Sequence, residues 1–372
     1  MKLSLTRGQS SEKKPPYAEA GVDTDLAARA LARLLVPIRG TFHERPGIGK
    51  PLLEIGYFAN VLDLGRGVGL VVAIDGVGTK ALIAQMMDKY DTIGIDCVAM
   101  NANDVLCVGA EPLAMLDYVA VQIPDETLME QIGEGLAKGA HIAGISIPGG
   151  EIAQIGEMLA GYGHGKAFDL VGCCVGLVEP ENILVGRDIQ AGDIVVGLTS
   201  SGIHSNGLTL ARRVLLEEAK LTVDSVVPEL QRTLGEELLE PTQIYVKPVR
   251  DMLKSGLLIK ALVHITSDGF LNLCRVDADV GFVIEYLPES PAIFQLIAEL
   301  GHVPNEEMFR VYNMGIGFCL VVDPKDAGKV VDVASQHGIE AFRLGYARPD
   351  PDRRVALQPL GLVGRGSAFT RV

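Results

Sequence analysis

The segment Asp75-Gly76-Val77-Gly78-Thr79-Lys80 holds the chain's most promising group of chemically active side chains. It follows the β-branched run 70–74, which predicts a buried strand that ends at Asp75. Ligand-binding loops emerge at such strand ends, and the two glycines let the backbone approach a bound group closely. A carboxylate can hold Mg²⁺ and a lysine can neutralise phosphate charge. The segment therefore suggests a magnesium–nucleotide site, although a tight turn with surface charges fits it equally well.

A predicted helix over residues 91–108 adds further carboxylates. Asp96, Asn103 and Asp104 lie within about 100° of one another at 3.6 residues per turn. Such groups on an otherwise apolar helix are costly to bury unless they are paired or bind a metal, and their sequence neighbours offer no cation. We therefore expect Asp75, Asp96 and Asp104 to share a Mg²⁺ ion. The alternative is a helix with one solvated polar stripe.

Three more polar stretches follow predicted strands, at 149–151, 200–207 and 264–270. The second leads directly into a helix, where hydroxyls, an amide and free backbone N–H groups can cradle a phosphate. An ordinary helix cap rich in serine would explain the same residues. His204, in this stretch, could transfer a proton, but a lone histidine more often only donates or accepts a hydrogen bond.

Composition restricts the classes of function. The chain has 372 residues, a formal net charge of −14 and no Trp, and its basic clusters are no larger than pairs. A surface for nucleic acid is therefore not expected. No run reaches the roughly 18 uncharged apolar residues of a membrane span, and the N-terminus lacks the apolar core of a signal peptide. The six cysteines form no C-x-x-C pair, which favours reduced thiols in a cytoplasmic protein.

The elements that must position these loops alternate irregularly between strands and helices. We expect strands at 70–74, 115–121, 170–178, 194–198, 261–265, 281–284, 315–322 and 341–344. Helices are expected at 24–36, 91–108, 127–143, 241–253, 293–300 and 325–337. Helices separate some strands and not others, which predicts an α/β protein with mixed sheets in two domains. The expected parts are a flexible leader (1–19), an N-terminal domain (20–179), a C-terminal domain (180–348) and a C-terminal extension (349–372).

The loops resemble, in order, the sequence blocks of one enzyme family. The matching blocks are 20–23, 75–80, 92–96, 103–104, 109–112, 116–118, 149–151, 200–207, 241–247 and 308–317. The chain is similar to the phosphoribosylformylglycinamidine cyclo-ligase (aminoimidazole ribonucleotide synthetase) family from about residue 17 to residue 346. Some single blocks also suit the wider superfamily, which includes selenophosphate synthetase and thiamine monophosphate kinase.

This resemblance implies a fold, a reaction and a set of site residues. The fold would be two α/β domains in a homodimer whose N-terminal-domain strands join across the interface. ATP with Mg²⁺ would phosphorylate the formyl amide oxygen of formylglycinamidine ribonucleotide, and an amidine nitrogen would then close the imidazole ring, a step of de novo purine biosynthesis. The implied catalytic residues are Asp75, Lys80 and His204. The nucleotide and metal would contact Asp75, Gly76, Gly78, Thr79, Lys80, Asn103 and Asp104. The substrate would face Gly149, Gly150, Glu151, Ser201, His204, Ser205, Asn206 and Thr266.

The sequence departs from the family pattern in three loops. Residues 55–59 keep only one glycine of a usual Gly-Gly-Phe-Gly loop. Ile152-Ala153-Gln154 replaces Thr-Ala-Glu, and Ser267-Asp268 replaces Gly-Gly. Because these loops are expected to contact ligands, two alternatives stay open. One is a related ATP-dependent kinase or synthetase acting on another small phosphorylated substrate, and the other is a non-catalytic paralogue that only binds nucleotide.

Overall fold

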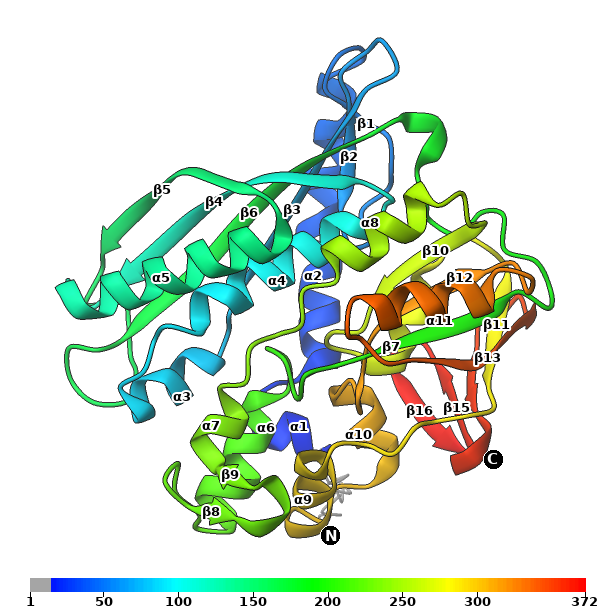
Figure 1. Ribbon diagram of the computed structural model, residues 1–372. Helices are drawn as coiled ribbons and strands as arrows, with labels where there is room; N and C mark the ends of the chain where they lie inside the picture. Colours follow the sequence, from blue (N-terminus) through cyan, green and yellow to red (C-terminus); the bar gives the residue numbers. More distant parts are fainter. Residues whose placement is uncertain (1–14) are drawn as a thin grey trace, which may run out of the picture.

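The computed structural model describes residues 15–372, which form two domains that each contain a mixed β-sheet (Figure 1). The first sheet has the strand order β1-β2-β3-β6-β4-β5. Its strands are β1 (Lys50–Pro51), β2 (Asn60–Asp63), β3 (Gly69–Gly76), β4 (Glu111–Val121), β5 (Ser146–Gln154) and β6 (Phe168–Val178). Only β4 and β5 pair in parallel. The mixed α/β prediction is therefore confirmed.

Three helices accompany this sheet: α3 (Lys80–Met87), α4 (Ile93–Leu106) and α5 (Glu126–Ala143). Helix α4 is buried along its whole length except at Asp104, because it lies between the sheet and α5. The two helices cross very closely at glycines. A side chain at Gly94 would collide with the backbone of Leu136, and one at Gly135 would lie 2.6 Å from the carbonyl oxygen of Asp91. The predicted helix over 91–108 is thus the central helix of the first domain.

The second sheet has the order β10-β12-β7-β13-β11-β14-β15-β16 and is antiparallel except where β11 meets β14. Its strands are β7 (Ile194–Thr199), β10 (Ile259–His264), β11 (Val280–Ile284), β12 (Ile316–Val322), β13 (Ala341–Pro349), β14 (Val355–Leu357), β15 (Leu362–Arg365) and β16 (Ala368–Arg371). The last three strands lie in the predicted C-terminal extension, so this segment extends the sheet. The sequence pattern did not predict them because each has only three or four residues.

The remaining elements surround the second sheet. They are α6 (Leu208–Arg212), a π-helical turn (Arg213–Glu218), α7 (Leu234–Leu238), α8 (Val246–Lys254), α9 (Ala292–Leu300), α10 (Asn305–Val311), α11 (Ala327–Gln336) and the small hairpin β8 (Val226–Val227) with β9 (Arg232–Thr233). Short 3₁₀ turns cover Thr41–Glu44, Pro180–Asn182, Pro228–Leu230, Gly269–Arg275 and Gln358–Leu360. Among residues 15–372, no helix combines the length and apolar character that a membrane crossing needs.

Two local predictions were wrong. The expected strand end at 149–151 lies in the middle of β5, which continues to Gln154 along the edge of the sheet. The expected helix over 241–253 begins only at Val246, because residues 241–245 are held in an irregular segment against the first domain. In both places a contact with a distant part of the chain, which no local pattern encodes, decides the backbone conformation.

The N-terminal segment is packed at its start and exposed afterwards. Of the predicted leader, residues 1–14 lie outside the described residues. The short helix α1 (Pro16–Glu19) packs near α10: Tyr17 is buried and its backbone N–H donates to Glu307 Oε1 at 3.1 Å. Residues 15–19 are therefore part of the folded domain. The predicted helix at 24–36 is confirmed as α2 (Thr24–Gly40), although none of its residues is buried.

Candidate functional site

Asp75 is the second-last residue of β3 and lies at the junction of the two domains. Its backbone is held by the side chain of Asn101, which accepts from Asp75 N at 2.9 Å and donates to Asp75 O at 3.0 Å. Burial, and after it the negative charge of Asp104, raise the pKa of Asp75 to about 6, although a hydrogen bond from Gly76 N and the nearby His264 act in the opposite direction. The two carboxylates therefore lie close enough to repel each other, which is typical of a site that receives a cation.

A histidine from the second domain completes this group. His264, at the end of β10, is fully buried, and its Nδ1 lies 2.9 Å from Asp104 Oδ1. Its Nε2 is also buried and has no hydrogen-bond partner among residues 15–372. The polar loop that begins at His264 is visible in the sequence, but no sequence pattern gives the histidine a role. The signal that could have identified it was its position at the end of a buried strand. Asp75, Asp104 and His264 are named here the carboxylate–histidine group.

Lys80 and Asp96 form a different arrangement from the one expected. Lys80 Nζ donates to Asp96 Oδ1 at 2.8 Å and to the carbonyl oxygen of Glu240 at 2.5 Å, and both charged side chains are fully buried. Asp96 Oδ1 also accepts from the backbone N–H of Thr242 at 2.7 Å and from its hydroxyl at 2.6 Å. Both members of this ion pair belong to the first domain, and their hydrogen bonds to Glu240 and Thr242 tie it to the second. In this arrangement the Lys80 ammonium is taken up by Asp96 and Glu240.

The structure does not bring the three expected carboxylates together. Asp96 is paired with Lys80, and among residues 15–372 no three His, Cys, Asp or Glu side chains lie together as metal ligands. Mg²⁺ usually takes only one or two carboxylates and completes its shell with waters and substrate phosphates. Asp75 and Asp104 fit that donor set, because they lie near each other and neither has a Lys or Arg partner in the described chain.

Other predicted nucleotide-binding residues hold the domains together. Asn103 Nδ2 donates to Gln243 O at 2.9 Å, and its Oδ1 accepts from Tyr245 N at 2.9 Å. The hydroxyl of Thr79 lies 3.0 Å from that of Thr209 in α6. Gly78 has a φ of 58° and no atom within 4 Å of a would-be side chain, so its backbone remains open to a ligand, whereas Gly76 lies against β6.

The 200–207 loop contacts the same junction. Ser201 Oγ donates to Pro241 O at 2.5 Å, and Ser205 Oγ lies 3.2 Å from Thr242 Oγ1. The Nε2 atom of His204 accepts from the backbone N–H groups of Ser201 (3.2 Å) and Gln243 (3.4 Å). Burial, followed by the charges of His264 and Lys80, holds the pKa of His204 well below its usual range. A neutral imidazole that accepts hydrogen bonds at Nε2 carries its proton on Nδ1. His204 can therefore donate a hydrogen bond through Nδ1, but it is not an imidazolium that could act as a strong general acid.

The remaining predicted substrate residues are less enclosed. Asn206 and Thr266 are half-buried, and Thr266 accepts a hydrogen bond from Gly269 N through its carbonyl oxygen. Gly149, Gly150 and Glu151 lie exposed on the edge strand β5. The carboxylate of Asp117 on β4 lies where a side chain at Gly150 would be, and burial raises the pKa of Asp117.

Asp117 extends the polar row that starts at Asp75. The strand register places Asp75 opposite Gly172 on β6, Gly172 opposite Asp117 on β4, and Asp117 opposite Gly150 on β5. Two carboxylates thus share one row across the sheet, with glycines between and beside them. In the sequence, Asp117 stands only inside the family block 116–118, and no local pattern marks it, because its row partners come from three separate strands.

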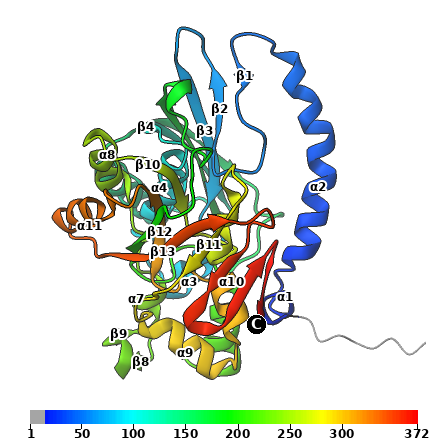
Figure 2. The same ribbon diagram turned by 90° about the vertical axis from the view of Figure 1, so that its right-hand side faces the viewer.

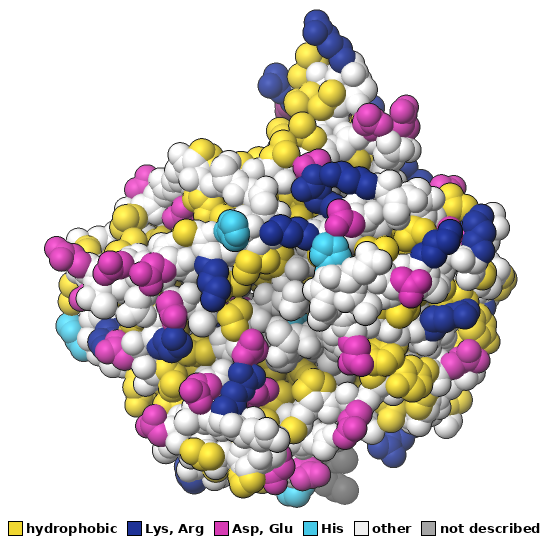
Figure 3. Space-filling model, viewed as in Figure 1, with side chains coloured by type: hydrophobic (Ala, Val, Ile, Leu, Met, Phe, Trp, Pro, Cys, Tyr) yellow, Lys and Arg dark blue, Asp and Glu magenta, His cyan; other side chains and the backbone are white. Residues whose placement is uncertain are grey.

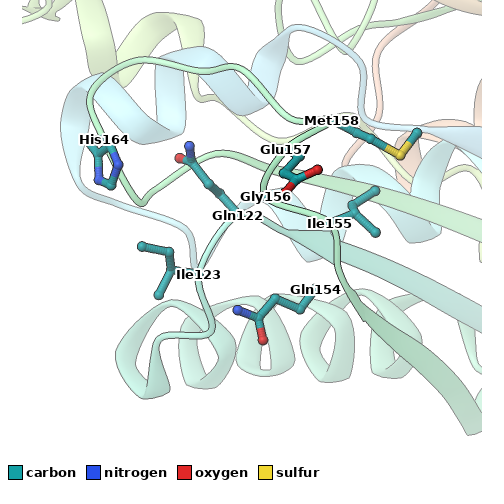
Figure 4. Close-up of a pocket in the computed structure, with 8 residues that line it drawn as sticks. All are labelled: Gln122, Ile123, Gln154, Ile155, Gly156, Glu157, Met158 and His164. Atoms are coloured by element: carbon teal, nitrogen blue, oxygen red, sulfur yellow. The ribbon is translucent and has the colours of Figure 1, made fainter.

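A hollow of about 580 Å³ lies beyond the ends of β4 and β5 (Figure 4). Figure 4 shows that its side chains come from the end of β4, the end of β5 and the loop that carries His164. Gln154, which replaces a glutamate of the family pattern, is one of them. Asp75, Asp104 and His264 do not line this hollow, so the altered residue 154 belongs to a different surface from the carboxylate–histidine group.

Charged side chains are intermixed on the face viewed in Figure 3, where acidic and basic groups alternate without a large patch of one sign. This agrees with the absence of basic clusters in the sequence.

Two family models match the chain. "AIR synthase related protein, N-terminal domain" matches residues 56–178, and "AIR synthase related protein, C-terminal domain" matches residues 190–358. The proteins named phosphoribosylformylglycinamidine cyclo-ligase in Thermococcus kodakarensis and Methanocaldococcus jannaschii are each 45% identical to this chain. The first aligns over 340 residues (91% of this chain and 97% of that protein), and the second over 331 residues (88% and 91%).

Solved structures share the fold at lower identity. Thiamine-monophosphate kinase from Stenotrophomonas maltophilia has a TM-score of 0.57 at 20% identity, covering 87% of this chain and 95% of the kinase. Thermotoga maritima PurL complexed with ATP has a TM-score of 0.53 at 16% identity, covering 82% of this chain and 45% of PurL. With both domain models matched in order and near-full-length relatives at 45% identity, the chain belongs to the AIR synthase related family.

Proposed function

We propose that this chain catalyses the ATP-dependent cyclisation of formylglycinamidine ribonucleotide to aminoimidazole ribonucleotide, with release of ADP and phosphate, in de novo purine biosynthesis. The observation that carries the proposal is the carboxylate–histidine group, which both domains build at their junction. The 45% identity to named cyclo-ligases over most of both chains supports the same reaction. It favours this reaction over the two alternatives left open by the altered loops.

The reaction needs an activated oxygen and a well-positioned nucleophile. Ring closure removes the formyl oxygen, which is a poor leaving group until ATP converts it to a phosphate ester. Attack by the amidine nitrogen is then intramolecular, so correct positioning supplies much of the rate. Asp75 and Asp104 would hold Mg²⁺, which would neutralise charge on the nucleotide phosphates. The open backbone at Gly78 lies beside them for the phosphate oxygens.

The two histidines are assigned different tasks. His264 holds Asp104 through Nδ1 and so orients the carboxylate for the cation, as outer partners of metal ligands do. His204 stays neutral because it is buried, and its Nδ1–H can only donate a hydrogen bond. We therefore assign His204 to orientation of the substrate or of the 200–207 loop, and Lys80 to holding the domains together.

The quaternary and domain assignments belong to the same proposal. We place the domain boundary at residues 179–180, between the two matched families. We infer a cytoplasmic homodimer that buries the face of the first sheet opposite α4. Ile74, Leu116 and Leu177 are 72%, 50% and 39% exposed on that face, and β5 leaves an unpaired edge. Large exposed apolar areas of this kind mark interaction surfaces.

The test is turnover with defined substrates. Purified protein with Mg-ATP should release ADP and form the imidazole product only when formylglycinamidine ribonucleotide is present. Asp104→Asn should abolish turnover, whereas the exposed Asp332→Asn should not change it. ADP release stimulated only by a different phosphorylated metabolite would overturn the proposed substrate. Nucleotide binding without turnover under every condition would overturn catalysis itself.

A further inference from the structure

Asn103, on α4, uses both ends of its amide to bind one segment of the second domain. The side chain is fully buried. Its Nδ2 donates to the carbonyl oxygen of Gln243 at 2.9 Å, and its Oδ1 accepts from the backbone N–H of Tyr245 at 2.9 Å. Holding a carbonyl oxygen and an N–H of the same segment needs a side chain that carries both a donor and an acceptor, as an amide does. Both polar atoms of Asn103 are therefore engaged with the protein.

Tyr245 links this segment to the strand that carries His264. The Tyr245 ring is fully buried, and its centroid lies 5.2 Å from that of Phe318 on β12. Phe318 is paired in register with His264 on the neighbouring strand β10, and 6.1 Å separate the centroids of their rings. The Tyr245 hydroxyl donates to the carbonyl oxygen of Thr199, at the end of β7, at 2.7 Å. Tyr245 is therefore fastened to the sheet that holds His264.

This chain of contacts returns to the next residue of the same helix. His264 Nδ1 lies 2.9 Å from Asp104 Oδ1, and Asp104 follows Asn103 directly on α4. Contacts therefore run in a closed path through Asn103, Tyr245, Phe318, His264 and Asp104. Figure 1 and Figure 2 both show α4 lying against α8 and β10, the two elements of the second domain that this path joins.

Asn103 is the second of two points at which α4 holds the second domain. The first is Asp96, about two helical turns or about 10 Å away along the helix. Without Asn103 the second domain can pivot about the Asp96 contact, and the displacement grows toward the Asp104 end of α4. A shift of about 1.5 Å would break the hydrogen bond between His264 and Asp104, because the distance would exceed about 3.5 Å. The Tyr57 hydroxyl also binds a carbonyl oxygen of β10, but it belongs to a loop and not to α4.

We propose that Asn103 is a positioning residue, which holds His264 on Asp104 through the second domain and so orients Asp104 for the cation. This rests on the metal site of the proposed function, in which Asp75 and Asp104 hold Mg²⁺. The family resemblance implied a direct contact between Asn103 and the nucleotide, and the engaged amide replaces that contact with an indirect role. Asn101 fixes the backbone of Asp75 with the same pairing of donor and acceptor. The two asparagines of α4 thus orient both carboxylates of the site.

A double-mutant cycle on Mg²⁺ affinity tests the path. Asn103→Leu should lose most of the affinity that His264→Leu loses, about 10-fold, because both variants remove the hydrogen bond between His264 and Asp104. Adding Asn103→Leu to His264→Leu should change the affinity by less than about 2-fold, since its effect passes through the missing histidine. Calorimetric titration with Mg²⁺ alone measures all four proteins. Additive losses would overturn the proposal, because Asn103 would then act on the metal independently of His264.

A matched control separates positioning from loss of stability. Asn313, in the second domain, is also buried and donates to two backbone carbonyl oxygens, those of Gly202 at 2.8 Å and Ile203 at 3.2 Å. Asn313→Leu should lower the free energy of unfolding as Asn103→Leu does, because both leave buried backbone groups without partners. Its Mg²⁺ affinity should stay within about 2-fold of the wild type. An equal loss of affinity in Asn313→Leu would overturn the proposal, since any weakening of the fold would then suffice.

The metal-free protein gives a measurement that needs neither Mg²⁺ nor substrate. With ¹⁵N-labelled histidine, the Nδ1–H of His264, identified by its loss in His264→Gln, should be protected from exchange by its bond to Asp104. That protection should fall at least about 10-fold in Asn103→Leu, and less in Tyr245→Phe, which removes one hydroxyl and keeps the buried ring. Unchanged protection in both variants would overturn the positioning role. A wild type that binds no Mg²⁺ would overturn the metal site of the proposed function, and the exchange measurement would still decide the role of Asn103.

Discussion

Two carboxylates on α4 meet the second domain in contrasting ways. Asp96 is fully buried, and one of its oxygens accepts from both Lys80 and Thr242. Asp104 lies about two helical turns further along and keeps 15% of its side chain exposed. Within residues 15–372 its side chain is hydrogen-bonded only to His264, and it lies near Asp75. The first carboxylate is neutralised by the fold, and the second retains capacity for a cation. Both residues carry a charge on the same helix. Asp96 is structural because Lys80 neutralises it, and Asp104 is the functional candidate because no Lys or Arg in the described chain does.

The largest expected effect is on turnover at Asp104. Asp104→Asn should lower kcat by at least about 100-fold, because it removes one of two carboxylates that would hold the metal–nucleotide charge. Its free energy of unfolding should change little, since Asp104 has no Lys or Arg partner in the described part of the chain. Steady-state kinetics and urea unfolding on the same preparation check both statements. Near-normal kcat would remove Asp104 from the site.

Breaking the buried Lys80–Asp96 ion pair should mainly lower the free energy of unfolding, in contrast to Asp104→Asn, which should mainly lower kcat. Lys80→Met leaves Asp96 charged and unpaired in the interior, which costs about 3–5 kcal/mol of unfolding free energy. The double variant Lys80→Met with Asp96→Leu should recover much of that loss, because it removes both charges. Urea unfolding of the single and double variants measures the recovery. If Lys80→Met unfolds like the wild type but loses nucleotide affinity, Lys80 binds phosphate after all.

The raised pKa of Asp75 predicts a pH dependence of stability. Its folded pKa of about 6 exceeds its ordinary value of 3.8, so the native state favours the protonated form. The associated stability is fully present below about pH 4 and is lost as pH rises through 6. By linkage it amounts to about 3 kcal/mol. Measured with a metal chelator, the free energy of unfolding of the wild type should fall by about 3 kcal/mol more between pH 4 and pH 7 than that of Asp75→Asn. Parallel curves would contradict it.

The smallest expected effect belongs to His264. His264→Leu removes the group that orients Asp104 and should weaken Mg²⁺ binding about 10-fold, the lower end of what outer-shell losses cost. His264→Gln keeps a donor and should retain part of the affinity. Titration with Mg²⁺ followed by calorimetry reads this effect without turnover. Equal affinity in all three proteins would assign His264 to packing alone.

Local sequence patterns predicted the helices and strands well, but not which distant residues contact their charged side chains. Helix α4 and strands β3, β4 and β6 follow from runs of apolar residues, and the polar loops follow from glycines and hydroxyls at their ends. The expectation that the α4 carboxylates lack a nearby cation was wrong for Asp96, which is paired with Lys80, 16 residues earlier in the chain. The second acceptor of Lys80, the carbonyl oxygen of Glu240, lies a further 160 residues along the chain. Likewise, His264 meets Asp104 across 160 residues. No periodicity within a window of the chain encodes such distances.

The sequence by itself determined the family, the mixed α/β architecture and the polar segments at the domain junction, because these depend on local patterns and on the order of blocks along the chain. Only the tertiary structure decided which carboxylate is neutralised and which stays available. It also decided that Gly149–Glu151 form an edge strand and that α2 is left uncovered. These outcomes depend on which distant groups share a low-dielectric interior, where an unpaired charge is costly and a paired one is locked in place.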